Sequence, residues 1–238
     1  MKAVIMAGGK GTRLAPLTDH APKPLMPILD KPILYYIIRL LKKHEITDIS
    51  VTLGYMANSI VETFGDGRDL GVHLRYVIEK EPLGTAGSVK KAAADYREDF
   101  LVISGDSYTD FNLTALVDFH RSHGKMVTIA ATRVKNPSEY GVMLLNNAGK
   151  VRTFIEKPKE PITDIVSTGI YVFRKEILKK IPDGFQDFAR DVFPSISGQI
   201  YAKIMNGYWS DIGTLPSYYM TNYLVVSPEE RAKVAATV

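Results

Sequence analysis

Short runs of apolar residues alternate along the first half of the chain with segments whose apolar positions recur at helical spacing. The strand-like runs, each bounded by glycine or polar turn residues, are 2–7, 48–53, 73–78, 100–103 and 126–132. The segments with one apolar helical face are 33–41, 57–64, 85–94 and 113–123. This alternation predicts a doubly wound α/β arrangement over about residues 1–135.

The pattern changes beyond residue 135. Two strand-like segments, 141–145 and 151–156, flank Asn146-Asn147-Ala148-Gly149 and so predict a hairpin. A strand over 165–173, a short helix over 175–180 and a strand over 200–205 follow. We therefore predict an α/β fold: a Rossmann-like mixed sheet flanked by helices, with a smaller α+β extension over about 136–227, in one domain spanning 1–238. Residues 228–238 read as a surface tail, or as the point where a longer protein continues.

Composition excludes several classes of protein. The 238 residues are 45% hydrophobic and 24% charged, as in a soluble globular domain. The chain has no cysteine, which excludes disulfides, zinc–thiolate sites, iron–sulfur clusters and cysteine nucleophiles and fits a cytoplasmic protein. No apolar run approaches the ~18 residues of a membrane span. The net charge of +4 is too small to indicate nucleic-acid binding.

The strongest local motif is Ala7-Gly8-Gly9-Lys10-Gly11-Thr12-Arg13, directly after the first predicted strand. An open α/β sheet binds ligands at this end of its strands, and glycines let the backbone approach a phosphate chain. A P-loop is excluded because Pro16 would soon interrupt the helix that such a loop opens. A dinucleotide fingerprint is excluded because Leu14 stands where a small residue is needed. The alternative interpretation is an ordinary turn.

Lys23 stands between two prolines, which hold it as a pre-positioned cation on a stiff segment. The alternative is a solvated lysine in a surface turn. Residues 1–31 contain five basic and two acidic side chains, a net charge of +3. This excess favours an anionic ligand near the glycine-rich loop.

Two carboxylates and one further lysine are candidates for the chemistry of the site. Asp106 follows a buried-type strand, and Asp211 lies two residues after Trp209, the only tryptophan. Each could cap a turn or helix, or both could converge on a hard cation such as Mg²⁺. Lys157 ends a predicted strand directly after Glu156, where a solvent-facing ion pair is the alternative. The loop 81–88 enters a helix and could offer backbone amides to a ligand, or simply use Thr85 as a cap.

Taken in order, these segments resemble the sugar-1-phosphate nucleotidylyltransferases. The matching segments span nearly the whole chain: 7–13, 23–24, 82–88, 105–106, 140–142, 156–158, 167–171 and 209–214. The resemblance implies a nucleotide-binding half (about 1–135) and a sugar-phosphate-binding half (about 136–227) in one domain. The implied reaction joins a nucleoside triphosphate to a sugar 1-phosphate and releases pyrophosphate. Its nucleophile is an anionic phosphate oxygen, so the site needs cations and Mg²⁺ rather than a general base.

The resemblance also implies roles for individual residues. Arg13 would hold the β- and γ-phosphates, Lys23 the α-phosphate, and Lys157 the phosphate of the sugar. Asp106 and Asp211 would hold Mg²⁺. The implied nucleotide-binding residues are Ala7, Gly8, Gly9, Gly11, Thr12, Arg13, Lys23, Glu81, Gly84 and Thr85. The implied sugar-binding residues are Tyr140, Gly141, Glu156, Lys157, Thr168 and Gly169.

The loop Glu81-Pro82-Leu83-Gly84-Thr85-Ala86-Gly87 is more similar to the mannose-1-phosphate guanylyltransferases than to the thymidylyltransferases. A carboxylate at Glu81 could accept from guanine N1–H and N2–H₂, so we expect GTP and mannose 1-phosphate as substrates. Two alternatives stay open: a UTP- or dTTP-dependent glucose-1-phosphate enzyme, and a non-catalytic regulatory homologue that binds nucleotide-sugar. We expect no nucleic-acid or membrane partner, and a homodimer stays open.

Overall fold

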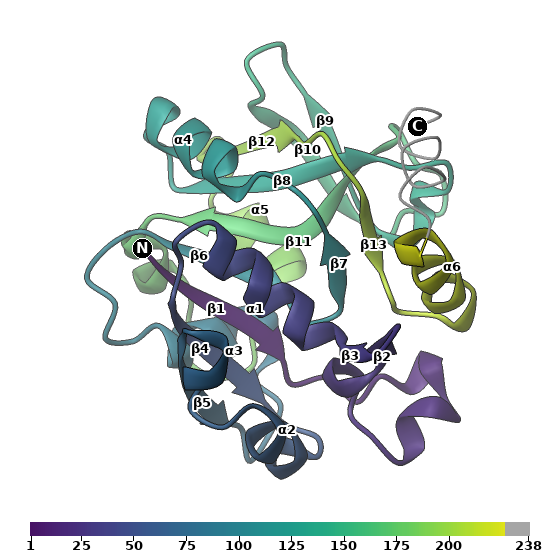
Figure 1. The fold of residues 1–238 in the computed structure, drawn as a ribbon. Coiled ribbons are helices and arrows are strands. Elements are labelled where there is room, and N and C mark those ends of the chain that lie inside the picture. Colours follow the sequence, from purple (N-terminus) through teal and green to yellow (C-terminus); the bar gives the residue numbers. More distant parts are fainter. Residues whose placement is uncertain (227–238) are drawn as a thin grey trace.

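The structure is a computed structural model that describes residues 1–226, so the predicted tail at 228–238 lies outside the described residues. Its centre is a nine-stranded sheet in the order β10-β9-β11-β6-β1-β4-β5, with β8 pairing β11 and β12 (Figure 1). The strands are β1 (Lys2–Ala7), β4 (Asp48–Leu53), β5 (His73–Ile78), β6 (Phe100–Ser104), β8 (Val127–Arg133), β9 (Gly141–Leu145), β10 (Val151–Glu156), β11 (Ile165–Phe173) and β12 (Ile200–Ile204).

The sheet is mixed, as the sequence predicts. β1 runs parallel to β4 and β6, and β4 runs parallel to β5. β11 runs antiparallel to β6 and to β8. Because β11 pairs with β6, one sheet continues through both predicted halves of the chain.

Helices cover both faces of the sheet (Figure 1). The helices are α1 (Ile33–Lys43), α2 (Ala57–Phe64), α3 (Gly84–Ala92), α4 (Leu113–His123), α5 (Phe193–Ser195) and α6 (Leu215–Val226). Of these, α6 packs mainly against two short strands outside the central sheet, β2 (Pro27–Ile28) and β13 (Trp209–Asp211). Successive residues of β1 point to opposite faces: Ala3 and Ile5 pack with α1, α2 and α4, whereas Val4 packs with α3 and α5. The two apolar clusters of the core therefore lie on opposite sides of one buried sheet. None of the helices among residues 1–226 is both long enough and apolar enough to cross a bilayer.

Two small sheets lie outside the central one and were not predicted from the sequence. β2 (Pro27–Ile28) pairs with β3 (Lys31–Pro32), and β7 (Ser107–Thr109) pairs antiparallel with β13 (Trp209–Asp211). The second pairing places Asp211 opposite Ser107, the residue after Asp106. The short helix predicted over 175–180 is a 3-10 helix, Lys175–Lys180.

Candidate active site

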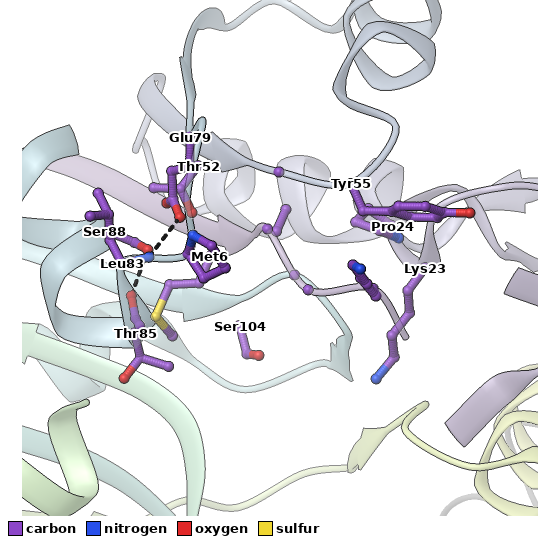
Figure 2. A pocket seen from close by; sticks show the side chains of 18 of the residues that line it. Met6, Lys23, Pro24, Thr52, Tyr55, Glu79, Leu83, Thr85, Ser88 and Ser104 are labelled. Atoms are coloured by element: carbon purple, nitrogen blue, oxygen red, sulfur yellow. Dashed lines mark hydrogen bonds between the residues drawn. The ribbon is translucent and has the colours of Figure 1, made fainter. Parts of the chain in front are cut away.

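A cavity of about 710 Å³ opens where four parallel strands end. Its walls come from the segments that follow β1, β4, β5 and β6, whose carboxyl ends meet at the same edge of the sheet. Figure 2 shows Lys23 and Tyr55 at one end of this cavity and Glu79, Ser88 and Thr85 at the other. The two ends therefore differ in chemistry: a cation at the first, and a carboxylate and two hydroxyls at the second.

The glycine-rich loop forms the floor of the cavity through Ala7, Gly8, Gly9 and Lys10. A Cβ atom on Gly54, at the end of β4, would lie only 2.8 Å from the backbone oxygen of Gly8. Glycine at position 54 is what lets the loops after β1 and β4 pack this closely.

The remaining residues of the glycine-rich motif turn away from the floor into a 3-10 helix, Thr12–Leu14. Gly11 begins this helix with φ +69°, and its backbone oxygen accepts a 2.9 Å hydrogen bond from the Thr18 hydroxyl. Arg13 is thereby carried toward the second carboxylate of the site: a Cβ atom on Gly213 would lie 2.9 Å from Asp211 Oδ2 and 3.2 Å from Arg13 Nη2.

Lys23 and Asp106 contact each other directly. Lys23 Nζ lies 2.5 Å from Asp106 Oδ2, and Ser104 Oγ donates to Asp106 Oδ1 at 2.6 Å. Burial alone would raise the pKa of Asp106, but the ammonium of Lys23 and the hydroxyl of Ser104 hold that pKa below its ordinary value. A carboxylate two residues beyond the end of β6 is therefore ionised and neutralised by a lysine from a segment 83 residues away.

Asp211 completes a group of two carboxylates and two cations. Burial raises the pKa of Asp211 and the nearby charge of Asp106 raises it further, whereas Lys23 and Arg13 oppose the rise. Four residues far apart in sequence are thus electrostatically coupled at one place. Within residues 1–226, no group of three or more His, Cys, Asp or Glu side chains is placed to hold a metal ion.

The residues predicted to face a sugar form a second cluster joined to Asp211. Burial, together with the neighbouring Asp211 carboxylate, raises the pKa of Tyr140 to about 12, and the Tyr140 ring packs edge-on against Trp209 at 5.4 Å. The Lys157 amide donates to the backbone oxygen of Tyr140 at 3.0 Å. Burial raises the pKa of Glu156, and the ammonium of Lys157 opposes that rise. These contacts connect the hairpin β9–β10 to Asp211.

Gly141 begins β9 beside the side chains of β10. A Cβ atom at this position would lie 2.9 Å from Glu156 Oε2 and 2.5 Å from the Phe154 ring. Glycine therefore leaves the space that the Glu156 carboxylate occupies.

Thr168 and Gly169 have structural positions that the resemblance does not convey. The Thr168 hydroxyl donates to the backbone oxygen of Ala130 at 2.8 Å, and the residue is 1% exposed. Its backbone oxygen accepts from the Trp209 indole at 3.1 Å. Gly169 has φ +73° where the pairing of β11 with β8 is irregular. The Thr168 side chain thus belongs to the core, and the residue acts on the site by holding Trp209.

Glu79 lines the cavity although it was not predicted from the sequence, whereas Glu81 was predicted to bind the nucleotide. Glu81 is exposed at the rim of the cavity. Glu79 follows the last residue of β5; its Oε2 accepts from the Leu83 amide at 3.4 Å, and its Oε1 is buried with no hydrogen-bond partner in the described chain. The rule that singles out Asp106, a carboxylate at the carboxyl end of a parallel strand, would also have found Glu79.

Gly84 and Thr85 bind another part of the chain. The amides of Ala86 and Gly87 donate to the backbone oxygen of Gln186 at 2.9 and 3.2 Å. The Thr85 hydroxyl donates to Asp187 Oδ2 at 2.9 Å. The start of α3 therefore anchors the segment 181–188, which was not predicted from the sequence to lie near the cavity. That segment has no strong periodicity to reveal its position.

Comparison with known proteins agrees with this geometry. A family model described as "Nucleotidyl transferase" matches residues 2–227. A UTP–glucose-1-phosphate uridylyltransferase of Synechocystis is 37% identical over 96% of this chain and 64% of its own length. The mannose-1-phosphate guanylyltransferase catalytic subunit beta of Drosophila melanogaster is 37% identical over 98% of the chain and 64% of its own length. The chain thus spans just under two thirds of these curated relatives.

Among solved structures, a putative glucose-1-phosphate thymidylyltransferase from Bacillus anthracis superposes with a TM-score of 0.86 at 27% identity, covering 95% of this chain and 96% of that one. HddC from Yersinia pseudotuberculosis complexed with GMP-PN superposes with a TM-score of 0.82 at 29% identity, covering 94% of this chain and 99% of that one. The mixed α/β fold with a central sheet flanked by helices is therefore shared with both.

Proposed function

The chain belongs to the nucleotidyl transferase family, and on that basis we propose that it makes a nucleotide-sugar and pyrophosphate from a nucleoside triphosphate and a sugar 1-phosphate. The observation that carries the proposal is the ion pair of Lys23 and Asp106 at the cationic end of the cavity, with Asp211 close enough to be coupled to both. Such a group suits the transfer of a phosphoryl-type group between two polyanions.

The reaction needs little from the protein besides charge and position. An oxygen of the sugar phosphate attacks the α-phosphorus, a P–O bond forms, and the bond to the β-phosphate breaks as pyrophosphate leaves. The attacking oxygen is already ionised, so no side chain has to remove a proton. We assign Lys23 to the α-phosphate, Arg13 to the leaving pyrophosphate and Lys157 to the sugar phosphate, which places cations where negative charge gathers.

The two carboxylates fit Mg²⁺ that is shared with substrate phosphates. Asp106 and Asp211 are hard oxygen donors, and the charge of the first raises the pKa of the second, a repulsion that a divalent cation would relieve. Mg²⁺ in such sites takes one or two carboxylates and completes its shell with phosphates and water. When bound, it would neutralise charge on the reacting phosphates.

We further propose GTP as the nucleotide and mannose 1-phosphate as the sugar phosphate, with Glu79 rather than Glu81 as the residue that reads the base. Glu79 has a buried oxygen without a hydrogen-bond partner among residues 1–226, and it lies at the end of the cavity away from Lys23. Guanine presents two adjacent donors to a carboxylate, whereas uracil and thymine present one N–H. The guanylyltransferase relative favours this choice, and the uridylyltransferase relative keeps UTP and glucose 1-phosphate as the alternative.

The activity is tested by measuring pyrophosphate release with GTP, UTP, dTTP and CTP, each paired with mannose 1-phosphate and with glucose 1-phosphate. Release with any pair excludes a purely regulatory protein, and GTP with mannose 1-phosphate should give the highest kcat/KM. Absence of release with every pair in the presence of Mg²⁺ would contradict the proposed activity.

Base selection is tested by Glu79→Gln, with Glu81→Gln as its matched control. A hydrogen bond to a charged group contributes about 1.5–3 kcal/mol, so Glu79→Gln should erode the preference for GTP over UTP by about one to two orders of magnitude. Glu81→Gln should leave the preference unchanged because Glu81 is exposed. Competition between equimolar nucleotides, scored by product identity, measures both. The reverse pattern would return base reading to Glu81.

A further inference from the structure

Residues 181–188 are fixed to α3 and to the residue before it by several contacts. Lys90 Nζ donates to the backbone oxygen of Ile181 at 2.7 Å and to Asp183 Oδ1 at 2.5 Å. The Gln186 amide donates to the backbone oxygen of Leu83 at 2.9 Å. Together with the Thr85–Asp187 bond, these contacts hold a segment of the second half of the chain against the first half.

The two glycines at the start of α3 permit this close approach. A Cβ atom on Gly84 would collide with the backbone oxygen of Gln186, and one on Gly87 would lie 2.5 Å from the backbone oxygen of Gly184. The oxygen of Gln186 also accepts from the amides of Ala86 and Gly87, the third and fourth residues of the helix, so these two amides are not available to a ligand. One role of the start of α3 at the cavity is therefore to position the segment 181–188.

The segment contributes two side chains to the cavity wall, Phe185 and Asp187. Phe185 is 64% exposed, although both of its neighbours are held against α3. Gln186 is held by backbone hydrogen bonds, and Gly184 packs closely against Gly87. A large aromatic ring on a fixed segment at the mouth of a cavity offers a flat apolar surface with little conformational entropy to lose on binding.

The charges near Phe185 indicate which part of a nucleotide lies against it. Asp187 lines the same wall, and its carboxylate would repel a phosphate. Thr85, which binds Asp187, lies at the end of the cavity with Glu79, whereas Lys23 lies at the other end (Figure 2). The wall that carries Phe185 therefore faces the uncharged part of the nucleotide.

We propose that Phe185 stacks on the nucleobase and that the second half of the chain thereby takes part in nucleotide binding. This inference rests on the proposed nucleotide site and adds to it a residue that acts on the face of the base, whereas Glu79 acts on its edge. Stacking is tolerant of base identity because every base has a π-face. Phe185 thus contributes affinity for any nucleotide, more for a purine than for a pyrimidine. Glu79 contributes the preference for one base over another.

The test compares Phe185→Ala, Phe185→Trp and the wild-type protein in calorimetric titrations with GTP and with UTP. We expect Phe185→Ala to weaken GTP binding about ten-fold and UTP binding less, and to leave the KM for the sugar phosphate unchanged. Phe185→Trp should restore affinity, and its added indole fluorescence should be quenched by GTP. Tyr219→Ala is the matched control: Tyr219 is 62% exposed but lies on α6, outside the cavity wall.

The outcomes separate this inference from the proposed function. If Phe185→Ala binds GTP as tightly as the wild-type protein does, or if GTP does not quench the indole of Phe185→Trp, the stacking role is overturned and the transferase proposal still stands. Failure of the wild-type protein to bind any nucleotide overturns both.

Discussion

Removing Lys23 should have two effects of opposite sign, a loss of turnover and a gain in metal affinity. The variant Lys23→Met removes the charge and keeps most of the side-chain volume. In the free protein the Lys23 ammonium lies 2.5 Å from Asp106 Oδ2. Asp106 is one of the two carboxylates proposed to bind Mg²⁺. A divalent cation that binds without nucleotide must therefore displace the ammonium of Lys23, a residue that is only 8% exposed.

The size of the effect follows from that contact. A hydrogen bond between charged groups contributes about 1.5–3 kcal/mol, which corresponds to roughly 10- to 150-fold in an equilibrium constant. We expect Lys23→Met to bind Mn²⁺ at least ten-fold more tightly than the wild-type protein in the absence of nucleotide. The same variant should lose one to two orders of magnitude in kcat, because the cation proposed to face the α-phosphate is gone.

Electron paramagnetic resonance of free Mn²⁺ measures the affinity directly, independent of activity. The titration is made at about pH 8, because Asp106 without Lys23 keeps its burial and its pKa rises. Lys10→Met is the control, since Lys10 also lines the cavity but is exposed and forms no ion pair within residues 1–226. Equal or weaker Mn²⁺ binding in Lys23→Met would refute the view that Lys23 and the metal compete for Asp106.

Two further changes test other parts of the molecule. Lys157→Ala should raise the KM for the sugar phosphate about ten-fold or more and change the KM for the nucleotide little, which steady-state kinetics with each substrate varied in turn would measure; the opposite split would contradict its assignment. Burial, reinforced by His123 and Arg174, lowers the pKa of His120 to about 4, so the folded protein keeps this histidine neutral while the unfolded chain protonates it below its ordinary 6.5. The contribution of neutral His120 to the free energy of unfolding is fully present above pH 6.5 and is lost as the pH falls toward 4. The free energy of unfolding should therefore fall by about 2 kcal/mol between pH 7 and pH 5. Urea unfolding at both pH values should show a smaller loss for His120→Gln, and parallel losses would disprove the assignment.

The elements that the sequence predicts well are those whose cause is local. β1, β4, β5 and β6 are continuous apolar runs, and the helices between them carry their apolar residues at helical spacing. The position of Asp106 also follows from local reasoning, because parallel strands end at one edge of a sheet. The same rule applied to β5 leads to Glu79, which the sequence analysis did not name.

The parts that could not be predicted depend on contacts between distant segments. β7 and β13 contain three residues each, too few for any periodicity, yet their pairing is what brings Asp211 to Asp106. The hydrogen bond between Thr85 and Asp187 joins residues 102 positions apart. For Thr168, the position in a motif suggests a contact with a ligand. Tertiary packing instead buries its hydroxyl, which donates a hydrogen bond to the backbone oxygen of Ala130.

The proposed roles separate the chemistry of the reaction from the choice of nucleotide. Lys23 and Asp106, which line one end of the cavity, are coupled to each other and to Asp211, so a change in any of them disturbs the charge balance of the others. Glu79 and Phe185 lie on other segments, one after β5 and one fixed to α3, and no hydrogen bond or ion pair found among residues 1–226 joins either of them directly to that group. A substitution at either position can therefore alter base affinity or base choice without altering the phosphate-binding charges. Base specificity in this fold should consequently be changed more easily at Glu79 and Phe185 than at any residue that binds phosphate.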